Sequence, residues 1–304
     1  AAAALARMTP HQALAALAGL TAAAASALMD PQHLAAVPTV PISPGIRLPY
    51  IALGTGSGML RPGSNVTAAV QLWLSVGGTA IDTAFDYHDE PAIAKGIAAS
   101  SAPAPFIITK IPCSTYAEAA ANIDSNLAQL GMESTSLLLI HFPQCAGLGS
   151  TAETWRAMED AQAVGKARVI GVSNFGIAEL EDLRQSARKW PPAVNQCSLS
   201  VGFHDDPTIE YCAMHGITYM AYSPLCGGAN GSSCRHGGVL GLPQVQSVAS
   251  AHNVSTAQVA LKWIVQQGHP LATAVWRRDY MEQDLDLWSW GDLSKEEMSL
   301  LTAV

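Results

Sequence analysis

Residues 106–141 read FIITKIPCSTYAEAAANIDSNLAQLGMESTSLLLIH. The apolar runs at 106–110 and 136–141 have the length and composition of buried β-strands. Between them, residues 116–130 space their apolar side chains as an amphipathic helix does. The stretch therefore predicts a strand–helix–strand unit, in which the helix carries the chain back to start a second, parallel strand.

The same alternation runs from residue 48 to the end of the chain. It predicts strands at 50–54, 79–82, 106–110, 136–141, 168–173, 193–197, 217–223 and 271–276. It predicts helices near 65–76, 89–100, 116–130, 151–165, 176–188, 206–215, 255–267 and 295–302. Eight strands with helices between them favour an α/β fold of the (β/α)₈ TIM-barrel type. An open doubly wound sheet is the alternative, but residues 54–58 (GTGSG) do not complete a G-x-G-x-x-G motif.

Two segments precede the strands of the barrel. Residues 40–48 predict a hairpin, turned at Pro44-Gly45, that plugs the bottom of the barrel. We therefore divide the chain into an Ala-rich extension, 1–37, and a barrel domain, 38–304. Within the extension, residues 12–29 are nearly all Ala and Leu and carry no charge. This helix can be a targeting segment, a membrane-associated helix, or a retained helix that packs on a protein partner or on the barrel. A cytoplasmic and an organellar location both stay open.

The composition excludes some classes of function. Charged residues make up 13% of the chain and the net charge is −8, so no basic face for nucleic acid is expected. The six cysteines form no C-x-x-C pair, which favours buried free thiols. Cys226, Cys234 and His236 share a glycine-rich loop, but their spacing fits no zinc site. We expect no metal.

Four chemically active side chains come at, or just after, the ends of predicted strands. Asp82, Lys110 and His141 each close one, and Tyr87 follows Asp82 by five residues. The carboxyl ends of barrel strands meet at one face, where active sites of this fold are built. A carboxylate, a phenol, an ammonium and an imidazole together suit proton-coupled reduction of a carbonyl group. Asp86 and His88 flank Tyr87 and make its setting unusually polar.

From about residue 40 to 301 the chain resembles the aldo-keto reductase family. The likeness rests on five ordered motifs besides the four active residues. They are LPYIALGTGS at 48–57, AIDTAFDY at 80–87, GKARVIGVSNF at 165–175, AVNQ at 193–196 and AYSPL at 221–225.

The resemblance implies a nicotinamide cofactor, NADPH with NADH possible, and a small carbonyl substrate. Ser173, Asn174 and Gln196 would hold the nicotinamide carboxamide, and Tyr222 would stack on its ring. The pyrophosphate would lie along Gly56, Ser57, Ser223 and Leu225, and Asp82 would belong to both the catalytic and the cofactor set. Catalysis would use Tyr87 as the proton donor, Lys110 to lower the pKa of its phenol, Asp82 to keep Lys110 charged, and His141 to donate a hydrogen bond to the carbonyl oxygen.

The chain departs from the family pattern in two regions. Pro112 stands where an aromatic residue is usual after the catalytic lysine, so the substrate remains open. After the eighth strand, Tyr280 falls on the position of the family's phosphate-binding arginine. Arg277 and Arg278 lie nearby and can bind a 2′-phosphate instead. The alternative function is a weakly active or inactive subunit of a larger assembly.

Overall fold

The structure, a computed structural model, describes residues 37–56, 65–145, 147–226 and 238–304, all within one compact unit. The predicted helix over 12–29, Ser57, Cys234 and His236 lie outside the described residues.

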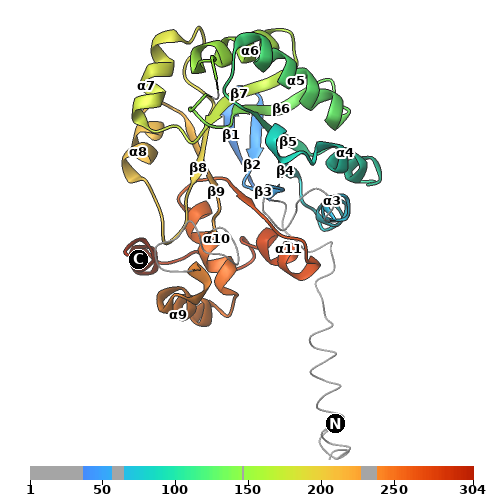
Figure 1. Ribbon diagram of the computed structural model, residues 1–304. Coiled ribbons are helices and arrows are strands. Elements are labelled where there is room, and N and C mark those ends of the chain that lie inside the picture. The colour runs from blue at the N-terminus through green and yellow to red at the C-terminus, as the bar shows by residue number, and fades with distance from the viewer. Residues whose placement is uncertain (1–36, 57–64, 146, 227–237) are drawn as a thin grey trace, which may run out of the picture. The chain divides into compact units, whose positions relative to one another are not determined.

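Eight parallel strands close into a barrel with helices around it (Figure 1), as the sequence predicted. The strands run in the order β10-β3-β4-β5-β6-β7-β8-β9. Their bounds are β3 Ile51–Gly54, β4 Ala80–Asp82, β5 Phe106–Ile111, β6 Thr135–Ile140, β7 Ala167–Ser173, β8 Val194–Ser198, β9 Thr218–Tyr222 and β10 Leu271–Thr273. Each strand therefore has the strand that precedes it along the chain as a neighbour, and β10 closes the ring against β3.

Helices α3 to α10 connect successive strands on the outside of the barrel, and α11 and α12 follow the last strand. Their bounds are α3 Val66–Ser75, α4 Glu90–Ala98, α5 Tyr116–Leu130, α6 Thr151–Ala163, α7 Ile177–Ser186, α8 Asp206–Met214, α9 Pro243–His252, α10 Thr256–Gln266, α11 Arg278–Leu285 and α12 Lys295–Thr302. Thr115 and Ser150 cap α5 and α6 with their side chains. Two of the helices, α9 and α11, were not predicted from the sequence.

An antiparallel hairpin plugs one end of the barrel, as predicted. Its strands are β1 Thr39–Ser43 and β2 Ile46–Pro49, and Gly45 takes a left-handed backbone at the turn, with φ 72°. Ile42 and Leu48 are buried among the side chains that fill the barrel, against strand-start residues such as Ala80 and Phe106. The plug thus closes the end where the strands begin, and leaves the carboxyl ends for a site.

Disulfide bonding contradicts the expectation of buried free thiols for three of the described cysteines, Cys113, Cys145 and Cys226. A disulfide links Cys113, after β5, to Cys145, after β6. Among the described residues, Cys197 and Cys212 are free.

Neither a membrane span nor a metal site is found in the part of the chain that the structure describes. No described helix is long and apolar enough to cross a bilayer. No group of three or more His, Cys, Asp or Glu side chains among the described residues could hold a metal ion.

Candidate active site

Asp82, Lys110 and Tyr87 come together at the carboxyl ends of β4 and β5. The Lys110 ammonium donates to Oδ1 of Asp82 over 2.6 Å and to the backbone oxygen of Thr83 over 3.0 Å. The same ammonium lies 5.3 Å from the centre of the Tyr87 ring. Both Asp82 and Lys110 are buried, so their pairing is what makes two buried charges tolerable.

Tyr87 is held by a short 3₁₀ turn, η2 Phe85–Tyr87, directly after β4. Gly56, at the end of the segment after β3, leaves room for its phenol. A Cβ atom on Gly56 would lie 2.4 Å from Cζ of Tyr87 and 2.7 Å from its hydroxyl oxygen. A side chain at position 56 would therefore push the phenol aside. The predicted contact of Gly56 with a pyrophosphate stays a prediction.

Burial and neighbouring charges set the pKa values of Lys110 and Tyr87. For Lys110, burial lowers the pKa, but the Asp82 carboxylate and Tyr87 outweigh it and leave the pKa raised, so the ammonium stays charged. For Tyr87, burial raises the pKa, and the Lys110 charge opposes the rise without cancelling it. Lys110 thus acts on the phenol pKa in the expected direction, but burial outweighs it and the pKa of Tyr87 stays above its usual value. The phenol keeps its proton at neutral pH, which suits a proton donor.

His141 completes the set of four from the next strand along, just after β6. Its ring meets the Tyr87 ring edge-on, with ring centres 5.5 Å apart, and stacks on Phe142 at 4.6 Å. Its Nδ1 atom lies 3.0 Å from Oδ2 of Asp86. Burial and the Lys110 charge lower the pKa of His141, while Asp86 opposes that shift. All four predicted catalytic residues are thus brought together.

The residues predicted to bind the nicotinamide form a hydrogen-bonded chain over the ends of β7, β8 and β9. The Ser173 hydroxyl donates to the backbone oxygen of Gln196 over 2.7 Å. The Asn174 amide donates to the Ser173 hydroxyl and to the backbone oxygen of His141. The Tyr222 hydroxyl donates to the Asn174 amide oxygen over 2.8 Å. Finally, Gln196 donates from Nε2 to Oδ2 of Asp82 over 2.7 Å and so joins this chain to the predicted catalytic residues.

The backbone at these strand ends is unusual. Asn174, after β7, and Ser223, after β9, both adopt left-handed conformations, with φ 64° and 52°. Residues with side chains avoid this region, and such strain concentrates at ligand-binding sites. Ser223 and Leu225 are half-buried in the segment after β9. This edge therefore has the character of a binding site. The predicted contact of Ser223 and Leu225 with a pyrophosphate stays a prediction.

Arg277 and Arg278 lie where α11 begins, after β10. Each already has a carboxylate partner on its own helix: Arg277 pairs with both oxygens of Asp279, and Arg278 with Glu282. The Arg277 guanidinium also lies over the Tyr280 ring, 4.3 Å from its centre. A phosphate at this site would have to compete with both carboxylates.

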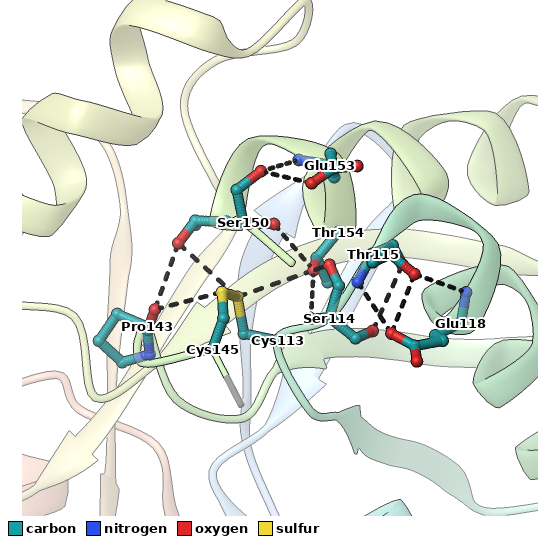
Figure 2. The surroundings of a disulfide bond; sticks show 10 residues. Cys113, Ser114, Thr115, Glu118, Pro143, Cys145, Ser150, Glu153 and Thr154 are labelled. Atoms are coloured by element: carbon teal, nitrogen blue, oxygen red, sulfur yellow. Dashed lines mark hydrogen bonds between the residues drawn. A yellow bond between two sulfur atoms is a disulfide. The ribbon is translucent and has the colours of Figure 1, made fainter. Parts of the chain in front are cut away.

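The Cys113–Cys145 disulfide joins the loops that follow β5 and β6, and Figure 2 shows its surroundings. Cys113 is three residues beyond Lys110, and Cys145 is four residues beyond His141. The Thr154 hydroxyl, on α6, donates to the backbone oxygen of Ser114 over 2.8 Å and accepts from its backbone amide. The loops that follow Lys110 and His141 are thus tied to each other and to α6.

The sequence profile of the Aldo/keto reductase family matches residues 51–304. The chain belongs to this family. This aldo/keto reductase is similar to NADPH-dependent codeinone reductase 1-4 of Papaver somniferum, with 30% identity over 88% of this chain and 89% of the relative. It is 31% identical to 9,11-endoperoxide prostaglandin H2 reductase of Trypanosoma cruzi, over 83% of this chain and 86% of the relative.

A solved structure shares the fold. The aldo-keto reductase of Bombyx mori, determined in complex with NADP, superposes with a TM-score of 0.80 and 27% identity, over 88% of this aldo/keto reductase and 93% of that chain.

Sequence reasoning missed two contacts of this site. The Asp86–His141 contact was visible only as an unusually polar neighbour of Tyr87. The Cys113–Cys145 bond gave no signal, because residues 32 apart become neighbours only when β5 and β6 pair.

Proposed function

We propose that this protein reduces an aldehyde or ketone to the alcohol with NADPH, and that Tyr87 donates the proton. One observation carries the proposal: a single buried ammonium, Lys110, contacts both the Asp82 carboxylate and the Tyr87 ring. Such a buried cation has little structural reason to sit under a phenol, and perturbed groups of this kind gather at active sites. The NADPH dependence named for the Papaver somniferum relative and the NADP bound to the Bombyx mori structure support the choice of cofactor.

The donor set fits a nicotinamide. Gln196 has its amide nitrogen engaged by Asp82, which turns the amide so that Oε1 can accept from a carboxamide N–H. The Tyr222 ring is half-buried and fixed through its hydroxyl to Asn174, so it offers a positioned aromatic face. The reduced nicotinamide would supply the hydride to the carbonyl carbon.

The chain's own residues would then manage the proton. As the carbonyl oxygen gains charge, the Tyr87 hydroxyl gives it a proton, and the alcohol forms. The phenolate left on Tyr87 is stabilised by the Lys110 ammonium until water returns a proton. Asp82, held by both Lys110 and Gln196, keeps that ammonium in place.

A cofactor titration followed by an aldehyde and ketone panel tests this function. Trp276, exposed beside Arg277, offers a fluorescent reporter at the proposed cofactor edge. We expect NADPH to quench tryptophan fluorescence and to be oxidised when a carbonyl substrate is added. If NADPH and NADH both fail to quench the fluorescence and no carbonyl is turned over, the result favours the alternative function, a non-catalytic subunit.

A further inference from the structure

We propose that Asp86 is a positioning residue that holds the proton of His141 on Nδ1, so that Nε2 donates to a carbonyl oxygen only when the ring is protonated. This inference deepens the proposed function and rests on it for its catalytic consequence. It assigns a role to Asp86, which is not one of the four predicted catalytic residues.

The geometry of η2 places Asp86 and Tyr87 on the same imidazole. Consecutive residues of a 3₁₀ turn point about 120° apart. Tyr87 turns its ring toward the His141 ring, while Asp86 brings a carboxylate oxygen to within 3.0 Å of Nδ1. The Asp86 side chain is 47% exposed and the His141 side chain 10%. The carboxylate therefore stays hydrated and acts on a buried ring from outside.

A carboxylate only accepts hydrogen bonds, so Nδ1 of His141 must be the donor. A neutral imidazole has a single N–H, which leaves Nε2 with a lone pair. Besides Asp86, the charged and titratable groups among the described residues that face the ring are Asp82 of β4, Tyr87 of η2 and Lys110 of β5. Burial and Lys110 lower the pKa of His141, so the ring is mostly neutral at neutral pH.

The consequence is that the direction of the hydrogen bond between Nε2 of His141 and the substrate oxygen depends on pH. A neutral ring accepts at Nε2, which suits an alcohol hydroxyl. A protonated ring donates from both nitrogens, to Asp86 and to a carbonyl oxygen, and so assists reduction. Carbonyl reduction should therefore accelerate as the pH falls through the pKa of His141.

Asp86→Asn tests the proposal, because an amide of the same shape can donate to Nδ1. The position of the ring proton is read at pH 8 from proton–nitrogen correlation spectra of protein labelled with ¹⁵N in its histidine rings. Comparison with His141→Gln identifies the His141 signals among the nine histidines. We expect the proton on Nδ1 in the parent protein and on Nε2 in Asp86→Asn.

Turnover gives the second readout. In the parent, kcat for reduction should rise about tenfold from pH 8 to pH 6, as one more donor reaches the oxygen. In Asp86→Asn the rise should vanish, because the neutral ring already donates. Asp206→Asn is the matched control, since Asp206 contacts Nδ1 of His204 at 2.7 Å in a similar pair. It should leave both the His141 signals and the profile unchanged.

The two failures are distinguishable. Each of three results would overturn the role of Asp86. The parent could carry the His141 proton on Nε2, the proton could stay on Nδ1 in Asp86→Asn, or the pH profile of that variant could match that of the parent. Absence of turnover with every carbonyl would instead refute the proposed function. The spectra would still show whether Asp86 sets the position of the His141 ring proton.

Discussion

Gln196 donates a hydrogen bond from Nε2 to Oδ2 of Asp82 over 2.7 Å, across the open end of the barrel. In the ring of strands, β8 and β4 stand opposite each other. The contact therefore joins the edge predicted to bind the nicotinamide to the carboxylate that holds Lys110. Both side chains are buried, so neither can exchange this bond for water without rearrangement.

We expect Gln196→Ala to weaken two properties at once. The variant loses the amide acceptor for a carboxamide and one of the donors to the buried Asp82 carboxylate. A hydrogen bond to a charged group contributes about 1.5–3 kcal/mol, so the dissociation constant for NADPH should rise and kcat should fall, each by about tenfold or more. Fluorescence titration and steady-state kinetics check this. A change in cofactor affinity alone would mean that the contact with Asp82 has no catalytic effect.

Tyr87→Phe should abolish most turnover and leave cofactor binding nearly unchanged, because only the hydroxyl is removed. Loss of a general acid lowers the rate by about 10²–10⁴-fold. Single-turnover kinetics with NADPH measure the chemical step. Tyr50→Phe is the control, since Tyr50 lies beside Trp288 and directly precedes β3, at the end where the strands begin. A Tyr87→Phe rate close to that of the parent would refute Tyr87 as the donor.

Replacing both Arg277 and Arg278 by Ala should reduce the preference for NADPH over NADH. The preference should be modest to begin with, because Asp279 and Glu282 already neutralise these arginines. We expect the ratio of the two dissociation constants to fall by about tenfold, the loss of one charge-assisted contact. Asp279→Asn should raise NADPH affinity by freeing Arg277. Arg168→Ala, at the start of β7, is the matched control. An unchanged ratio in the double variant would place the 2′-phosphate elsewhere.

The Cys113–Cys145 disulfide should stabilise the fold and the two loops that follow β5 and β6. For a loop of 32 residues, chain entropy gives about 3–4 kcal/mol as an upper value. We expect Cys113→Ser with Cys145→Ser to lower the free energy of unfolding, and to raise KM for the carbonyl more than the dissociation constant of NADPH. The reason is that the bond ties the loops after β5 and β6, whereas the predicted carboxamide residues follow β7 and β8.

A reductant supplies the control for the disulfide. Reduction should lower the unfolding free energy of the parent at least as far as the double substitution does, because Cys226 is disulfide-bonded as well and a reductant also acts on that bond. Equal unfolding free energies of oxidised parent and double variant would show that the bond does not stabilise the protein.

Two buried carboxyls should make the protein less stable as the pH rises. Burial raises the pKa of Glu90 and that of Asp284 to about 7 each. A carboxyl whose folded-state pKa lies above its unfolded value stabilises the fold fully below about pH 4, and this contribution is lost as the pH passes 7. At 1.4 kcal/mol per unit of pKa shift, the upper value of this contribution is about 3 kcal/mol for Glu90 and about 4 kcal/mol for Asp284.

Glu90→Gln isolates one of these groups, because a glutamine oxygen can still accept from the Thr109 hydroxyl as Glu90 does. Denaturation at pH 5 and pH 8 should show that the variant loses less stability than the parent over this range. Glu210→Gln, on the exposed face of α8, should follow the parent. Identical pH dependence of Glu90→Gln and parent would contradict the raised pKa of Glu90.

The sequence by itself determined the barrel and the face at which the four predicted catalytic residues lie. Buried parallel strands need continuous apolar runs, and the predicted runs 79–82, 106–110 and 136–141 each end at a polar residue that marks the carboxyl end. The order of Asp82, Tyr87, Lys110 and His141 along the chain therefore placed them at one face. Helix α11 was missed because its sequence, RDYMEQDL, is mostly polar. Helix α9 was also missed, although Val245, Val248 and Ala249 form a helical apolar face.

Only the tertiary structure decided which of these groups touch. Gln196 meets Asp82, and Cys113 meets Cys145, because closing the ring brings β8 opposite β4 and pairs β5 with β6. The phenol of Tyr87 has a raised pKa because burial outweighs the Lys110 charge, a balance set by depth and distance. Asp86 reaches Nδ1 of His141 because η2 turns it there. Spacing along a chain fixes which strand end a residue occupies, but contact distances and desolvation exist only once the barrel has closed.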